Sequence, residues 1–375
     1  MTRTVHSHNP SGGSPFAVDF DQAPLLVIWE CTRACALACR HCRADAIDQR
    51  DPDELDTSEG RNLLDQIRGM GTPIVVFTGG DPLQRPDLEE LIRHAKTIGL
   101  RAGTIPAGTP RLTRERMESL KSTGVDQVAF SLDASTAAAH DAFRQVPGSF
   151  ENTLRGARWA RELDIPLQIN TVFHRDNLHD FEGIARMVGE LGTVFWEVFF
   201  LVPTGRGSEL QGCSASEMEA LFSQLYTLSK TSPFVVKVTE AQHYRRHVMQ
   251  RQREEGQRAD SGRGAVQEIR KGGHPGSIGR SSRVVNAGNG FLFVDHVGNI
   301  CPSGFLPEIR GNVRTHSLTE VYRNDTFFQA LRNPANLTGK CGRCEFRASC
   351  GGSRSRAWAV HGDAFAEEPC CVLER

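Results

Sequence analysis

The stretch WECTRACALACRHC, from Trp29 to Cys42, decides how this chain of 375 residues is interpreted. Three of its cysteines, Cys35, Cys39 and Cys42, stand in a C-x3-C-x2-C array. Thiolates at this spacing can converge on one iron–sulfur cluster, which usually takes four cysteine ligands. Three ligands would leave one iron of a four-iron cluster open to another molecule. From this stretch alone, a zinc site completed by Cys31 and simple packing of small apolar thiols both stay open.

The composition is that of a globular protein without a strongly charged partner. Hydrophobic residues make up 39% and charged residues 24% of the chain, an ordinary mix. The formal net charge of −1 gives no reason to expect nucleic acid or an acidic membrane as a partner. No apolar run approaches the length of a membrane span, and residues 1–13 lack the apolar core of a signal peptide. We therefore expect a cytoplasmic protein.

The eleven cysteines favour metal or redox chemistry over a disulfide scaffold. They cluster at residues 31–42 and 341–371, with only Cys213 and Cys301 between these clusters. The C-terminal cluster lies in glycine-rich sequence with little apolar material for a core. Bound metal would therefore have to supply part of its stability.

Short apolar strands alternate with amphipathic helices from residue 25 to residue 229. The predicted strands cover residues 25–29, 73–77, 101–105, 127–132, 166–173 and 194–202, and helices follow from residue 57 and at 87–98, 113–122, 150–163, 181–191 and 214–229. Six such units in order imply right-handed crossovers and a parallel sheet. Because a closed barrel needs eight units, we predict an α/β fold with a partial (β/α)6 barrel of the TIM type. An open doubly wound sheet is the alternative.

The pattern also predicts a division of the chain. Residues 1–23 are expected to be a flexible lead-in, and residues 24–235 form the barrel. Residues 236–283 are rich in charge, glycine and serine, and we expect a helical, charged linker there. Residues 284–375 then form a small Cys-rich C-terminal domain.

A C-x3-C-x2-C array directly after a short apolar strand resembles the signature of the radical S-adenosylmethionine (SAM) enzymes, and the resemblance covers roughly residues 24–371. It implies that Cys35, Cys39 and Cys42 hold a 4Fe–4S cluster whose open iron is chelated by SAM. One electron from the cluster then cleaves SAM to methionine and a 5′-deoxyadenosyl radical, which abstracts hydrogen from a substrate. A reductant such as flavodoxin or ferredoxin would supply the electron.

The same resemblance implies a set of SAM contacts. The loop TGGDP, residues 78–82, matches the GGE-P loop that holds the SAM amino group, with Asp in place of Glu. Glycine there permits close approach of the backbone to a ligand. The implied contacts are His41, Gly79, Gly80, Asp81, Pro82, Ser131, Asp133, Asn170 and Val202. Apart from the resemblance, most of these residues are ordinary turn or helix-cap residues, although Asn170 stands inside an apolar strand and needs a partner.

The C-terminal cysteines form a second candidate metal site. Their C-x2-C-x5-C spacing with a distant fourth thiol suits either zinc or a 4Fe–4S cluster. The segment resembles the SPASM-type extension, which binds auxiliary iron–sulfur clusters. The resemblance implies one auxiliary 4Fe–4S cluster on Cys341, Cys344, Cys350 and Cys371, with Cys370 as the alternative fourth ligand.

A second auxiliary cluster would need ligands that the sequence does not offer in the usual places. Cys301 matches one cysteine of the pattern for that site, but Asn286 and Ser353 stand where others are expected. We therefore expect one auxiliary cluster. A second one, with Cys301 and unusual ligands, is the alternative.

Several phrases look closest to the haem-maturing branch of this group, which comprises anaerobic haem b synthase and the haem d1 synthesis proteins. They are CRHCRA (39–44), HDAFR (140–144), PSGFLP (302–307) and CGGSRSRA (350–357). This resemblance implies oxidative decarboxylation of porphyrin propionates in tetrapyrrole maturation. Arg206, Arg354 and Arg356 are candidates to bind the propionates in a bidentate manner.

Two other functions remain open. A SPASM maturase would modify a ribosomally made peptide, but such enzymes often carry a peptide-binding domain before the barrel, where this chain has only a short polar lead-in. A non-catalytic iron–sulfur carrier would not need the open iron or the paired glycines Gly79 and Gly80.

Overall fold

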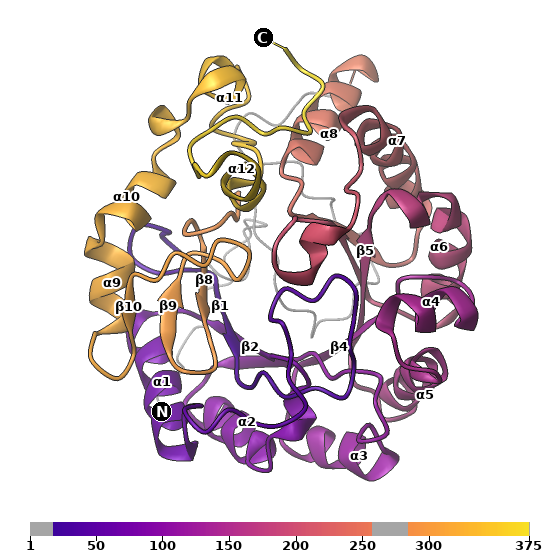
Figure 1. Cartoon of the computed structure of the whole chain (residues 1–375), viewed down its shortest axis with the longest axis vertical. Helices are drawn as coiled ribbons and strands as arrows, with labels where there is room; N and C mark the ends of the chain where they lie inside the picture. Colours follow the sequence, from indigo (N-terminus) through magenta and orange to yellow (C-terminus); the bar gives the residue numbers. More distant parts are fainter. Residues whose placement is uncertain (1–17, 257–283, 375) are drawn as a thin grey trace, which may run out of the picture.

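The computed structural model describes residues 18–256 and 284–374, and one curved sheet organises this part of the chain (Figure 1). Its strands run in the order β10-β9-β8-β1-β2-β3-β4-β5-β6-β7. They are β1 (Leu26–Glu30), β2 (Ile74–Thr78), β3 (Arg101–Thr104), β4 (Gln127–Ser131), β5 (Leu167–Phe173), β6 (Phe195–Phe200), β7 (Val235–Thr239), β8 (Phe291–Val294), β9 (Asn299–Cys301) and β10 (Gly311–Asn312). Neighbours from β8 to β7 are parallel, whereas β9 pairs antiparallel with both β8 and β10.

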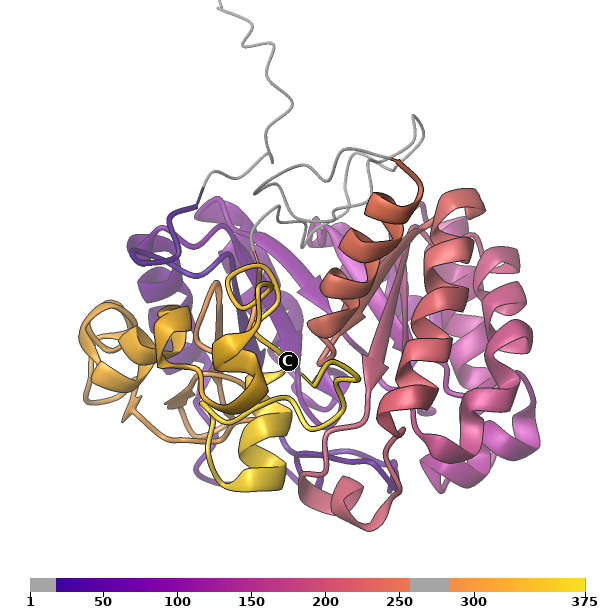
Figure 2. The same ribbon diagram turned by 90° about the horizontal axis from the view of Figure 1, so that it is seen from above.

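Helices lie around the outside of the parallel strands (Figures 1 and 2). The helices of the barrel are α1 (Thr57–Met70), α2 (Leu88–Thr97), α3 (Arg114–Ser122), α4 (Ala137–Arg144), α5 (Ser149–Glu162), α6 (Phe181–Glu190), α7 (Ala215–Thr231) and α8 (His243–Glu254). The C-terminal part adds α9 (Leu318–Asn324), α10 (Thr326–Arg332), α11 (Gly339–Arg343) and α12 (Arg354–His361). Short 3-10 turns are η1 (Pro82–Gln84), η2 (Arg175–Asp180), η3 (Gly205–Glu209) and η4 (Pro334–Asn336).

The continuous apolar runs of the strands follow from burial on both faces of the sheet. In β1, Val27 and Trp29 pack into the core beneath the helices, whereas Leu26 and Ile28 face the interior of the barrel. This alternation is the two-residue period of a strand. A parallel sheet with both faces covered selects apolar residues at every position, which is why these strands could be recognised from the sequence.

The predicted α/β fold with a partial barrel is confirmed, and the structure extends it. The six predicted strand–helix units occur in the predicted order. Residues 235–239 add a seventh parallel strand, β7, and residues 243–254 form α8, although most of this stretch was expected to be linker. Residues 257–283 of that linker and residues 1–17 of the lead-in lie outside the described part of the chain.

The C-terminal part joins the barrel through the sheet and the core. Strand β8 pairs in parallel with β1, so that Leu292 lies beside Val27. The Tyr322 hydroxyl donates to the Phe20 carbonyl (2.8 Å) and accepts from the Gly290 amide (3.2 Å). Leu292 and Tyr322 are fully buried in the same core cluster as the barrel strands. The two parts therefore share one hydrophobic core.

In the described residues, no helix has the length and apolar character that a membrane span requires.

The shared core predicts cooperative unfolding. Leu292→Ala should lower the free energy of unfolding by about 2–5 kcal/mol, because it leaves a cavity between β8 and the barrel. Denaturation followed by far-UV circular dichroism and tryptophan fluorescence should show one coincident transition. Val360→Ala is the matched control, since Val360 is exposed on α12 in the same C-terminal part. Two separate transitions would show that the C-terminal part folds on its own.

Candidate active site

The three cysteines of the opening motif meet at one cavity. A loop follows the end of β1 and carries Cys35, Cys39 and Cys42 to the wall of a cavity of about 490 Å³. This cavity runs from the carboxyl ends of the strands into the interior of the barrel. Cys31 is fully buried outside it, and its thiol donates to the Thr78 carbonyl at 3.1 Å. The structure thus separates Cys31 from the other three cysteines of the motif.

Each of the three sulfurs has a hydrogen-bond donor within reach. The Leu37 amide points at Cys35 Sγ (3.3 Å), the Ala46 amide at Cys42 Sγ (3.5 Å), and the Arg144 guanidinium at Cys39 Sγ (3.5 Å). Such donors stabilise negative charge on sulfur and tune metal centres bound through thiolates. These residues therefore fit a cluster held by three thiolates.

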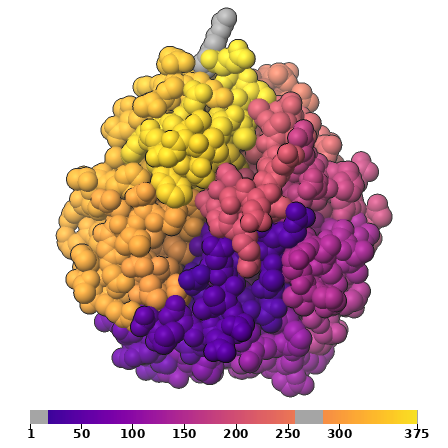
Figure 3. All heavy atoms as spheres, viewed as in Figure 1, coloured from indigo at the N-terminus to yellow at the C-terminus, as the bar shows by residue number. Residues whose placement is uncertain are grey.

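Figure 3 shows the cysteine loop, in indigo, at the surface beside the segment of η3. The Arg206 amide donates to the Cys42 carbonyl (3.1 Å), and its guanidinium Nε donates to the Cys39 carbonyl (3.0 Å). Arg206 thus braces the loop. The proposal that it binds a substrate propionate is not supported by this placement.

The paired glycines lock the cysteine loop in place. The Gly80 amide donates to the Thr32 carbonyl (2.8 Å), and the Asp81 amide donates to the Ala34 carbonyl (2.7 Å). A Cβ atom at Gly80 would lie 2.4 Å from the Ala34 carbonyl oxygen, closer than a real contact allows. The loop after β2 therefore needs glycine for its packing against the cysteine loop, in addition to any contact with a ligand.

The structure corrects the expectation for Asp81 and Pro82, since neither lines the cavity. The Asp81 carboxylate is buried and accepts from the Leu83 amide (3.1 Å), the Ala107 amide (3.2 Å) and the Thr109 hydroxyl (2.9 Å). Its oxygens are therefore used to fold the turn at η1. Gly79 and Gly80 do line the cavity.

Asp133 is also turned away from the cavity. It is buried and forms an ion pair with Arg144, whose Nε lies 2.8 Å from Oδ2, and it accepts from the Val172 amide (2.9 Å). Burial disfavours its charge, but Arg144 holds the pKa of Asp133 below its usual value. Arg144 also donates to Cys39 Sγ. Asp133 therefore holds the guanidinium that contacts the cysteine loop, and its own carboxylate does not face the cavity.

The remaining expected contacts do line the cavity: His41, Ser131, Asn170 and Val202. His41 stacks on Phe143 with ring centroids 4.5 Å apart, and Phe143 stacks on His174 at 4.8 Å. Burial lowers the pKa of His41 to about 3, so its imidazole is neutral at pH 7. A neutral ring backed by two further rings offers a flat surface suited to a nucleobase.

Sequence reasoning named Ser131 and Asn170 but missed that Glu197 and Lys237 continue them as one row of polar side chains inside the barrel. Ser131, Asn170, Glu197 and Lys237 pair in register across β4, β5, β6 and β7 and all line the cavity. The opposite wall is apolar, and it is formed by Leu26, Ile28, Ile74, Val76, Phe291 and Phe293. The cavity thus has one polar and one apolar wall.

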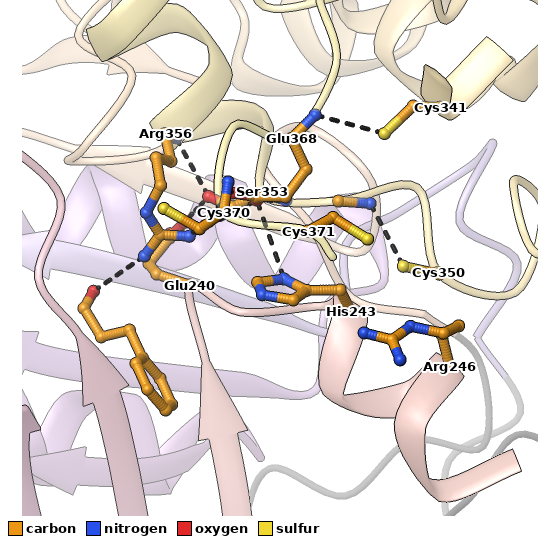
Figure 4. A network of polar contacts seen from close by, with 12 residues as sticks. Glu240, His243, Arg246, Cys341, Cys350, Ser353, Arg356, Glu368, Cys370 and Cys371 are labelled. Atoms are coloured by element: carbon orange, nitrogen blue, oxygen red, sulfur yellow. Dashed lines mark hydrogen bonds and ion pairs between the residues drawn. The ribbon is translucent and has the colours of Figure 1, made fainter. Parts of the chain in front are cut away.

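The C-terminal cysteines form a second site (Figure 4). Cys341, Cys344, Cys350 and Cys371 line one small cavity together with His243. Amides of Glu368, Phe346 and Gly352 point at the sulfurs of Cys341 (3.2 Å), Cys344 (3.4 Å) and Cys350 (3.4 Å), respectively. In the described residues, no three potential ligands are close enough to hold a single metal ion. Four thiols around one cavity, three of them with amide donors, suit a 4Fe–4S cluster.

Cys370 and Cys301 stand apart from this site. The Cys370 thiol lies 3.6 Å from the Cys213 carbonyl, and Cys301 is buried in β9. Neither residue lines either of the two cavities. The placement favours Cys371 over Cys370 as the fourth ligand, as the sequence suggested.

The residues that replace expected cysteines have structural partners. The Asn286 amide donates to the Gly352 carbonyl (2.8 Å). The Ser353 hydroxyl donates to Glu240 (2.6 Å), and its amide donates to Glu368 (2.8 Å). Both residues thus belong to the hydrogen-bond network around the second site.

Arg354 and Arg356 are also part of this network, which corrects the idea that they bind propionates. Each residue is only 2% exposed, and neither lines the large cavity. Arg354 donates to the Ala364 carbonyl (2.8 Å), whereas Arg356 lies 3.4 Å from Glu368 and donates to the Leu201 carbonyl (3.3 Å). Arg356 therefore links the second site to the end of β6 (Figure 4).

Comparison with known proteins agrees with this site. Residues 29–188 match the radical SAM superfamily. The chain is 41% identical to an "AdoMet-dependent heme synthase" of Nitratidesulfovibrio vulgaris, over 92% of this chain and 91% of that protein. It is 39% identical to a protein of the same name from Methanosarcina barkeri, over 93% and 97%. The structure of Streptococcus suis SuiB bound to S-adenosylmethionine shares the fold, with a TM-score of 0.70 at 13% identity, covering 94% of this chain and 78% of that one.

The two thiol sites predict the iron content. The anaerobically reconstituted wild type should contain about eight irons, and Cys341→Ala/Cys344→Ala about four, since one 4Fe–4S cluster is lost. Cys31→Ala is the control and should keep about eight, because Cys31 lines neither cavity. A double variant with undiminished iron would contradict the assignment of the second site.

The contact between the two loops predicts the effect of Gly80→Ala. The new methyl group would push the cysteine loop away from the turn, and an error of about 1 Å in a reacting geometry costs on the order of a hundredfold in rate. The rate of 5′-deoxyadenosine formation should fall by that order. Gly69→Ala on α1 is the control, since a Cβ there meets no other atom within 4 Å. Wild-type rates in Gly80→Ala would show that this contact is not needed.

Proposed function

The chain belongs to the radical SAM superfamily and to the family of its haem synthase relatives, and on this basis we propose that it converts propionate side chains of an iron porphyrin to vinyl groups. The observation that carries the proposal is the single cavity that joins the three-cysteine loop to the interior of the barrel. A SAM molecule at the loop and a substrate in the barrel would then be in contact. The names of the relatives support a tetrapyrrole as that substrate.

The proposed roles follow from the placement of the residues. Cys35, Cys39 and Cys42 would hold the 4Fe–4S cluster, which supplies the electron for cleavage of SAM. Gly79 and Gly80 would receive the amino end of SAM, and His41 its adenine; Ser131, Asn170 and Val202 are the other cavity-lining residues proposed to contact it.

The proposed reaction balances as an oxidative decarboxylation. The 5′-deoxyadenosyl radical takes one hydrogen atom from the propionate carbon next to the ring. The carbon–carbon bond to the carboxylate then breaks, so that carbon dioxide leaves, a vinyl group forms and one electron remains. Enclosure in the barrel keeps water away from the radical.

The remaining electron needs an acceptor. We assign this role to the second site, with Cys341, Cys344, Cys350 and Cys371 as ligands of an auxiliary 4Fe–4S cluster. The buried network of Arg356, Glu368 and Ser353 lies between that site and the end of β6. An external carrier such as flavodoxin or ferredoxin would supply the electron for SAM cleavage.

The proposal is tested by incubating the reduced, reconstituted protein with SAM and iron coproporphyrin under anaerobic conditions. Mass spectrometry should show loss of propionate carboxylates with one 5′-deoxyadenosine formed for each vinyl group. Cys35→Ala is the control and should form neither product. Absence of 5′-deoxyadenosine from the wild type under all conditions would contradict an enzyme of this class. Conversion of a ribosomally made peptide, with the porphyrin left unchanged, would identify a peptide maturase instead.

A further inference from the structure

A half-buried ion pair inside the barrel, between Lys237 and Glu197, has no role in the site as described above. Lys237 Nζ on β7 lies 2.8 Å from Glu197 Oε1 on β6, and both side chains line the large cavity. The Lys237 side chain is 33% exposed and that of Glu197 12%. Because the exposed part faces the cavity, the pair is open to whatever fills the barrel.

The position of the pair relates it to the proposed SAM contacts. Ser131 pairs in register with Asn170, Asn170 with Glu197, and Glu197 with Lys237. These four side chains therefore form one row along the inner wall. The row begins with two proposed SAM contacts and ends with Glu197 and Lys237, at the place where a molecule beside SAM would lie.

A purely structural role would not require this pair. Barrel interiors are normally filled by branched apolar side chains, and a buried ion pair is often no more stabilising than apolar residues of the same volume. The facing wall, with Ile28, Val76 and Phe293, follows the apolar rule. Glu197 and Lys237 are thus charged residues inside the barrel, on the wall that continues the row of proposed SAM contacts.

Glu197 would remain hydrogen-bonded if Lys237 turned to another partner. Its Oε2 accepts from the Gln168 amide (2.7 Å), and its Oε1 accepts from the Thr239 hydroxyl (2.6 Å). A lysine ammonium has three donors on a flexible stem. Lys237 can therefore keep its contact with Glu197 while it donates to a second oxygen acceptor in the cavity.

The arginines that line the cavity are engaged in holding the protein together. Arg43 forms an ion pair with Glu30, and Arg144 forms one with Asp133. Arg245 on α8 donates from Nε to the Ser349 carbonyl (3.1 Å). Compared with these arginines, Lys237 is the cation that is best placed to meet an anionic ligand in the cavity.

We propose that Lys237, which is paired with Glu197 when no ligand is present, binds a carboxylate of the substrate. The apolar wall opposite would receive the body of the substrate. Together they recognise a flat apolar molecule with carboxylates at its edge, and the carboxylate on Lys237 sets which side chain faces SAM. This inference rests on the proposed function, since it takes the iron porphyrin as the substrate.

The test compares two ligands on the reconstituted protein: iron coproporphyrin, which has four carboxylates, and its tetramethyl ester, both in the same detergent. Binding is followed by the Soret absorbance. Lys237→Met should weaken binding of the acid by roughly ten- to a hundredfold, the worth of a hydrogen bond to a charged group, and leave binding of the ester unchanged. Lys230→Met is the control and should change neither affinity, since the Lys230 side chain on α7 is exposed.

A second variant keeps the test independent of folding defects. Glu197→Gln removes the competing carboxylate but keeps the shape, so it should bind the acid at least as tightly as the wild type. If the ion pair had only a structural role, both variants would bind the acid and the ester more weakly, and to the same extent.

The outcomes separate the two levels of the proposal. Three results for Lys237→Met would overturn the role of Lys237: an equal loss of affinity for acid and ester, no loss for either, or a loss of affinity for SAM instead. The proposed conversion of porphyrin by the wild type would not be affected by any of them. A wild type that binds neither porphyrin would contradict the proposed function and this inference with it.

Discussion

The backbone hydrogen bonds between the cysteine loop and the glycine turn after β2 are the constraint on which the rest of the structure depends. They join Thr32 to Gly80 and Ala34 to Asp81, and they leave no space for a side chain at Gly80. Because β1 and β2 are parallel neighbours, their carboxyl ends bring these loops together at one edge of the sheet. The three thiols are thereby held at the mouth of the barrel. Arg206 adds a second brace from η3, through the carbonyls of Cys39 and Cys42.

The same edge connects the barrel to the C-terminal part. Arg356 from α12 reaches the carbonyls of Phe200 and Leu201 at the end of β6, and Glu368 beside it lies next to the second cysteine site. Strand β8 continues the sheet beyond β1. The two thiol sites therefore belong to one folded unit. The buried polar network of Arg356 and Glu368 lies between the end of β6, beside the large cavity, and the second site.

The sequence predicted the features that depend on local pattern. Strands buried on both faces appear as apolar runs, and cysteine spacing marks both thiol sites. It did not predict the features that depend on contacts between distant residues. Asp81 and Asp133 looked like ligand contacts, but their own loops and Arg144 take their oxygens. Arg354 and Arg356 were candidates to bind propionates, yet both are buried and donate to backbone carbonyls of the protein. Glu197 and Lys237 are forty residues apart and meet only through the register of β6 and β7.

The central claim is that the radical formed at this site acts on a porphyrin propionate, and hydrogen transfer tests it most directly. Iron coproporphyrin carrying deuterium on the propionate carbons next to the ring would be incubated with SAM and the reduced protein. One deuterium is expected in each 5′-deoxyadenosine molecule, in step with formation of a vinyl group. Formation of 5′-deoxyadenosine without deuterium, while vinyl groups appear, would contradict the central claim.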